Sequence, residues 1–98
     1  MPFNQHVPRP FTANMIHMYA PTASGVYGVS NSREWIYIGE TADIQSALLA
    51  HAQNSDASLM EHQPTGFVFE LCDGGSRPDR QDRLVREYAP KCNRLSER

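Results

Sequence analysis

Two tyrosines and a histidine are the side chains whose types and spacing could perform chemistry in this sequence. Tyr27 lies two residues after Gly25, and Tyr37 lies two residues before Gly39. If the two segments pair as a β-hairpin, both phenol hydroxyls can come to one face and form a catalytic site. His51 follows on a predicted helix and could shuttle a proton. The alternative for each is a packing role, in which a half-buried side chain makes one hydrogen bond.

The other histidines and the cysteines do not indicate a metal site. His6, His17 and His62 have no ligand spacing relative to one another. Cys72 and Cys92 form no CxxC pair and lie twenty residues apart, which excludes a zinc ribbon and gives no support for a disulfide. We therefore expect two reduced thiols and no metal ligands.

A hairpin and a helix are expected to position the three candidates. The hairpin consists of two short apolar strands and a polar turn, predicted at Val26 to Ser30, Glu34 to Ile38 and Asn31 to Arg33 respectively. The helix should begin at Thr41 or Asp43 and end near Asn54. Its apolar stripe contains Ile44, Leu48 and His51 at i, i+4 and i+7.

Further elements are predicted on both sides of this unit. The proline-rich residues 1–10 indicate an irregular arm, and the alternation of residue types from Phe11 to Tyr19 favours a strand over a loop packed across the core. The later elements are a short helix, a strand and a last helix, predicted at Ser55 to Glu61, at Thr65 to Leu71, and from Arg77 or Asp79 to Tyr88.

These elements predict an α+β fold, with a small three-stranded antiparallel or mixed sheet flanked by two to three helices. Residues 1–24 would form an N-terminal arm that could add a fourth strand, residues 25–93 the domain and residues 94–98 a tail. A chain of 98 residues is expected to form one domain. Because the sequence has neither a long apolar run nor the apolar centre of a secretory signal, we expect a cytoplasmic protein without a membrane partner.

Charge is unevenly distributed, although the net charge is only −2. Residues 34–76 contain acidic residues but no lysine or arginine. We therefore expect the face formed by the hairpin and the helix that follows it to repel DNA. The last helix carries arginines every three residues, including Arg80, Arg83 and Arg86. They are interpreted either as a solvated, salt-bridged helix face or as a weak contact for nucleic acid or an acidic partner.

Several short motifs resemble those of the GIY-YIG nuclease superfamily. The two name-giving motifs read Gly25-Val26-Tyr27 and Tyr37-Ile38-Gly39. Similarity continues through Gly39-Glu40-Thr41 into a helix that ends at the family's histidine position, and through Leu84 to Asn93, which looks like the family's closing helix, proline and asparagine. The resemblance covers about residues 25 to 93 and implies the GIY-YIG fold.

The resemblance also implies a set of catalytic roles. In the family, a tyrosine acts as or helps position the general base, an arginine on the first helix stabilises phosphate charge, and a glutamate on the last helix holds a divalent metal. Tyr27 and Tyr37 match the two tyrosines. The arginine position is occupied by Ala47, the glutamate position by Gln81, and the position that often carries a lysine by Glu40.

We therefore expect a degenerate domain, with a vestigial site at Tyr27, Tyr37 and His51, no cofactor, and a residual binding role. One alternative is a metal-dependent DNA endonuclease that uses Mg²⁺, Glu70 or Asp82, and an arginine of the last helix. Another is a protein-interaction module without a nucleic-acid role. The sequence does not decide whether the domain is an enzyme, although it favours inactivity, and the partner could be a protein or a weakly bound nucleic acid.

Overall fold

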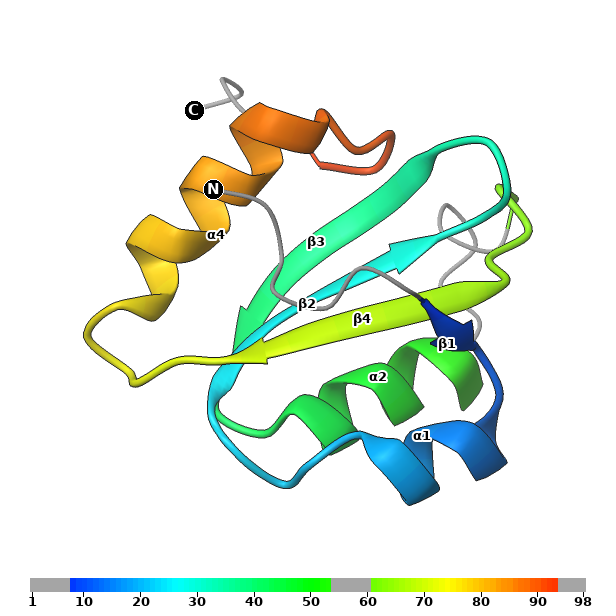
Figure 1. The fold of residues 1–98 in the computed structure, drawn as a ribbon, viewed down its shortest axis with the longest axis horizontal. Coiled ribbons are helices and arrows are strands. Elements are labelled where there is room, and N and C mark those ends of the chain that lie inside the picture. Colours follow the sequence, from blue (N-terminus) through cyan, green and yellow to red (C-terminus); the bar gives the residue numbers. More distant parts are fainter. Residues whose placement is uncertain (1–7, 54–60, 94–98) are drawn as a thin grey trace.

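The computed structural model describes residues 8–53 and 61–93 of the chain. These residues form four strands and three helices (Figure 1). In chain order they are β1 Arg9–Pro10, α1 Ala13–Tyr19, β2 Gly25–Ser30, β3 Trp35–Thr41, α2 Ile44–Gln53, β4 Gly66–Leu71 and α4 Arg77–Tyr88. None of the described helices is long and apolar enough to cross a membrane.

The strands form one antiparallel sheet in the order β1-β4-β2-β3. Strand β2 lies between β4 and β3 and is buried along its whole length. Its small and apolar sequence, GVYGVS, suits a strand that has neighbours on both sides and helices on both faces. The sheet confirms the predicted α+β class and the predicted β2–β3 hairpin.

Helices cover both faces of the sheet (Figure 1). Helices α1 and α2 pack on one face, where Ile16, Ile44 and Leu48 are fully buried against the strands. Helix α4 packs on the other face through Leu84 and Val85. The predicted helices at α2 and α4 and the predicted strand at β4 are confirmed within a few residues.

The beginning of α2 is fixed by two side chains. The amide nitrogen of Asp43 donates to Thr41 Oγ1 over 3.1 Å, and the amide nitrogen of Ser46 donates to Asp43 Oδ1 over 3.1 Å. Asp43 therefore satisfies one of the free amide groups of the first turn, as expected for an N-cap. The helix begins directly after it, at Ile44.

The prediction of a strand from Phe11 to Tyr19 is wrong, because Ala13–Tyr19 is helix α1. The amide of Met15 donates to Thr12 Oγ1 over 3.2 Å, so a threonine N-cap begins this helix. Ile16 and Ala20, four residues apart, are its buried contacts. The fourth strand lies instead at Arg9–Pro10, within the segment predicted to be an irregular arm. Most of the short helix predicted at Ser55 to Glu61 lies outside the described residues.

The edge of the sheet at β3 is covered by the residues that follow α4. The amides of Lys91 and Cys92 donate to the carbonyl oxygens of Trp35 and Ile36 over 3.1 and 2.7 Å. The side chain of Asn93 then pairs with the backbone of Ile38. Both cysteines are free thiols.

Candidate functional site

Tyr27 and Tyr37 lie on the same face of the β2–β3 hairpin. Tyr27 is opposite Gly39, and Tyr37 is opposite Val29. Since side chains two residues apart along a strand point to the same face, this register brings the phenols together. Their ring centroids are 6.0 Å apart, and both rings face helix α2.

His51, near the end of α2, completes a cluster with the two tyrosines. Its Nε2 atom lies 2.9 Å from the hydroxyl oxygen of Tyr27. Its ring centroid lies 5.3 Å from that of Tyr37. The three side chains predicted from the sequence as a candidate site are therefore gathered at one place between the hairpin and α2.

Gly39 makes room for the phenol of Tyr27. A Cβ atom at position 39 would lie 2.6 Å from the hydroxyl oxygen of Tyr27 and 2.8 Å from the ring of Tyr37. Both distances are shorter than real side-chain contacts allow, so any larger residue would displace the rings. The glycine of the second motif therefore has a steric role that sequence spacing alone did not reveal.

The environment of Tyr27 keeps its hydroxyl protonated. Only 4% of the residue is exposed. Burial raises the pKa of Tyr27 far above its ordinary value of 10.0, and the neighbouring Tyr37 and the carboxylate of Glu40 raise it further. At neutral pH this phenol is therefore protonated and can donate or accept a hydrogen bond.

Ala47 leaves the α2 side of the site without a cation. It lies four residues before His51 on the same helix face and packs against the apolar cluster beneath α2. A methyl group at this position supplies packing and no charge.

Gln81 is held by the backbone of β3. Its Nε2 donates to the carbonyl oxygen of Ile38 over 3.1 Å. Asn93 Nδ2 donates to the same oxygen over 2.9 Å, and the amide of Ile38 donates to Asn93 Oδ1 over 2.8 Å. Gln81 and Asn93 thus tie α4 and the closing segment to the edge strand. The sequence placed Asn93 in a closing motif but gave no signal of this contact.

Glu40 forms an ion pair with a residue that the sequence analysis did not associate with the site. Arg77 Nε donates to Glu40 Oε1 over 2.8 Å, and Arg77 Nη1 donates to Ser24 Oγ over 3.0 Å. The sequence has no basic residue between positions 34 and 76, and the basic group beside Glu40 comes from outside this range. The packing of α4 on the sheet brings Arg77 to a carboxylate that is 37 residues away in the sequence.

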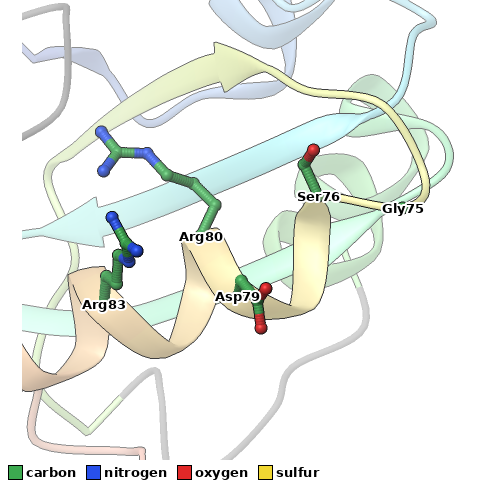
Figure 2. Close-up of a pocket in the computed structure, with 5 residues that line it drawn as sticks. All are labelled: Gly75, Ser76, Asp79, Arg80 and Arg83. Atoms are coloured by element: carbon green, nitrogen blue, oxygen red, sulfur yellow. The ribbon is translucent and has the colours of Figure 1, made fainter.

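The candidate nucleic-acid arginines on α4 differ in their contacts. Arg80 forms a bidentate pair with Glu70, at 2.7 and 2.8 Å. Arg86 pairs with Asp82 over 2.9 Å. The side chains of Arg80 and Arg83 extend to the same side of the helix (Figure 2). They help line a shallow pocket of about 250 Å³ at the beginning of α4.

The carboxylates considered as alternative metal ligands are both engaged in these pairs. Glu70 is held by Arg80, and Asp82 is held by Arg86. Within residues 8–53 and 61–93, no three His, Cys, Asp or Glu side chains are gathered as a metal site. At the position where the resemblance implies a metal-binding carboxylate, Gln81 offers an amide oxygen, which is a weaker ligand for Mg²⁺. The described residues do not fit the Mg²⁺ site that the resemblance implies for active members.

Comparison with known proteins identifies the fold. No protein-family model and no curated protein matches the sequence. The fold is similar to solved structures of the GIY-YIG N-terminal endonuclease domain of UvrC from Thermotoga maritima. For the magnesium-bound domain the TM-score is 0.72 at 19% identity, covering 84% of this chain and 96% of that one.

Two point mutants of the same domain, both bound to its catalytic divalent cation, give similar values. A tyrosine-to-phenylalanine mutant has a TM-score of 0.71 at 19% identity and covers 84% of this chain and 94% of that one. An asparagine-to-alanine mutant has a TM-score of 0.69 at 18% identity and covers 81% and 91%. The chain therefore has the GIY-YIG fold that the resemblance of residues 25 to 93 implied.

Proposed function

We propose that this chain is a GIY-YIG domain that has lost ordinary nuclease activity and retains a binding role. The proposal rests mainly on the residue at the position where the resemblance implies a metal-binding carboxylate. Gln81 stands there, and its amide is bonded to the carbonyl oxygen of Ile38. A neutral amide lacks the charge of the carboxylate that the metal-dependent mechanism uses.

The cation expected to stabilise the transition state is also missing. Ala47 stands in its place, and Arg77 is bound to Glu40. Loss of one transition-state hydrogen-bond donor typically costs about 10² to 10³ in rate. Loss of an arginine in phosphoryl transfer can cost about 10³ to 10⁵. Even if these losses are not additive, hydrolysis by the family's mechanism should be close to background.

The protonation state of Tyr27 supports the same proposal. A general base should have a pKa near the working pH. Burial raises the pKa of Tyr27 away from neutral pH, and the methyl group of Ala47 supplies no positive charge that would lower it again. The hydroxyl of Tyr27 is bonded to His51. The tyrosines and His51 then serve mainly to hold α2 on the hairpin.

A binding role can be assigned most directly to the exposed side of α4. Arg83 is exposed and lines the pocket in Figure 2 beside Arg80. With a net charge of −2 and with Arg80 and Arg86 already paired, contact with phosphates would be weak and strongly dependent on salt.

Cleavage and binding assays test the proposal. Purified protein with Mg²⁺ or Mn²⁺ is incubated with supercoiled plasmid, and the Tyr27→Phe variant serves as the control. We expect no nicking above the protein-free sample at high protein concentration. Metal-dependent nicking that Tyr27→Phe abolishes would instead identify an active endonuclease with non-standard residues.

A gel-shift titration at decreasing salt then distinguishes the two binding roles. A shift that appears only at low ionic strength and weakens in Arg83→Gln would support nucleic-acid binding by α4. If no shift appears at any salt concentration, the binding role is assigned to a protein partner.

A further inference from the structure

The two edges of the sheet differ in a way that points to a second interaction surface. Residues 91–93 cover the β3 edge through backbone and side-chain hydrogen bonds. At the other edge, β1 pairs only with Gly66 and Phe67 of β4. In the part of the chain that the structure describes, the stretch Val68–Leu71 has no strand on its outer side.

The register shows which backbone groups face outward along this stretch. The amide of Cys72 donates to the carbonyl oxygen of Ser24 over 3.0 Å. These two residues continue the register of β4 and β2, in which Leu71 lies opposite Gly25. Since hydrogen-bonding directions alternate along an antiparallel strand, Glu70 also bonds to β2. Phe69 and Leu71 therefore direct their N–H and C=O groups away from the sheet.

The stretch Val68–Leu71 contains none of the lysines, prolines or bulges that usually prevent edge-to-edge association. The one charged residue of β4, Glu70, is neutralised by the bidentate pair with Arg80. Leu71 is 62% exposed and lies at the end of the open stretch. The one charge of the strand is therefore paired, and the stretch presents regularly spaced donors and acceptors.

We propose that a second copy of this chain pairs with this edge, strand β4 against strand β4, about a two-fold axis at Glu70. In this antiparallel register each Phe69 lies opposite Leu71 of the second copy. The N–H of each residue donates to the C=O of the other, so the outward backbone groups of both copies are hydrogen-bonded. The inference concerns a different surface from the proposed nucleic-acid contact and does not depend on it.

The ends of the open stretch favour a second copy over an unrelated peptide. Strand β1 of one copy occupies the edge up to Phe67, which limits the pairing on that side. In the two-fold register that position faces residue 73 of the other copy, where the chain leaves the sheet after β4 ends at Leu71. The part of β4 that β1 does not cover, Val68–Leu71, therefore has the same length as the part of the second β4 that would pair with it. The two Glu70 side chains can lie opposite each other because each is paired with its own Arg80.

The pairing is short, which determines its expected strength. Stable interfaces bury about 1,200 to 2,000 Å² in total, and a few strand residues from each copy bury less. We therefore expect a reversible dimer that dissociates on dilution.

Sedimentation equilibrium of the full chain over a range of concentrations tests the proposal. We expect reversible dimer formation that is abolished, or weakened at least about tenfold, by Leu71→Lys. The matched control is Met18→Lys, which replaces another exposed hydrophobic residue, 68% exposed on α1, and should leave the equilibrium unchanged. A dimer that Met18→Lys disrupts and Leu71→Lys does not would overturn the proposal.

Amide hydrogen exchange of the wild-type chain is a second test of the dimer and needs no variant. The amides of Phe69 and Leu71 should become protected as the protein concentration rises. A chain that stays monomeric at every concentration overturns the proposal. Protected amides in that monomer would place another segment of the same chain on the edge, and unprotected amides would leave the edge to a different protein.

Discussion

The side-chain amide of Gln81 donates a hydrogen bond to the carbonyl oxygen of Ile38, at 3.1 Å. This contact links α4 to the strand that carries the second tyrosine motif. It occupies the amide nitrogen of the residue that stands where the family places a metal-binding carboxylate. A position associated with catalysis therefore stabilises the packing of a helix on an edge strand.

Replacing this amide by a carboxylate should destabilise the fold in a pH-dependent way. In Gln81→Glu, the protonated acid can still donate to Ile38, whereas the carboxylate faces a carbonyl oxygen. The folded-state pKa should therefore lie above the ordinary glutamate value of about 4.3. The stabilising donation is present below that value and is lost as the pH rises through the folded-state pKa.

We expect Gln81→Glu to lose about 1 to 2 kcal/mol of unfolding free energy at pH 7 and less at pH 4, measured by urea denaturation. Gln81→Met is the control, because it removes the amide without adding charge. The loss in Gln81→Met should be smaller, because Asn93 still donates to Ile38. It should not vary with pH, because methionine does not titrate. Equal losses at both pH values for Gln81→Glu would show that the amide contact is unimportant.

Removing the hydroxyl of Tyr27 should break its hydrogen bond with His51 Nε2, at 2.9 Å. We expect Tyr27→Phe to lower the unfolding free energy by about 1 kcal/mol, the usual net contribution of a hydrogen bond. Tyr19→Phe is the matched control, because Tyr19 is 39% exposed and its ring remains under the guanidinium of Arg9. A control variant as destabilised as Tyr27→Phe would argue against a special role for the Tyr27–His51 bond.

The phenol of Tyr27 should ionise only above its ordinary pKa of 10.0. Because burial raises its folded-state pKa above the unfolded value, the unfolded chain loses its proton first as the pH rises. Stability that is complete below about pH 10 should therefore decrease above it. A spectrophotometric titration should show one phenol that ionises only with alkaline unfolding and that is missing in Tyr27→Phe. Ionisation of Tyr27 near pH 10 in the folded protein would disagree with this description of the site.

The ion pairs of α4 should differ in their contribution to stability. Arg80 and Glu70 are 15% and 13% exposed, and loss of the arginine leaves a poorly solvated carboxylate. We expect Arg80→Met to cost about 2 kcal/mol, less than a fully buried pair. Arg86→Met on the same helix should cost less than about 1 kcal/mol, because its pair with Asp82 is largely exposed. Thermal denaturation of the two variants side by side measures the difference, and equal midpoints would refute it.

Most of the fold could be predicted from local sequence signals. Two short apolar segments around the turn at residues 31–33 identified the hairpin, and a cap with an apolar stripe identified α2. Aromatic and branched residues identified β4, and a proline near the helix start identified α4. The segment from Phe11 to Tyr19 was misassigned because its loose alternation resembled a strand. The helical signal was Ile16 and Ala20, four residues apart, after the capping Thr12.

The cluster of Tyr27, Tyr37 and His51 could also be predicted, because hairpin register and helix periodicity are local properties. The pairing of Arg77 with Glu40 and the contact of Asn93 with Ile38 could not. Each joins residues more than thirty positions apart, and only the packing of α4 and of the closing segment on β3 brings them together.

The central claim is that the replaced charged groups, and not the scaffold, account for a lack of nuclease activity. Plasmid nicking with Mn²⁺ tests it most directly, with the wild type compared in one assay with the double variant Ala47→Arg/Gln81→Glu. We predict that the wild type does not exceed the protein-free control, whereas the double variant nicks the plasmid and loses this activity when Tyr27→Phe is added. Nicking by the wild type that depends on metal and on Tyr27 would contradict the claim.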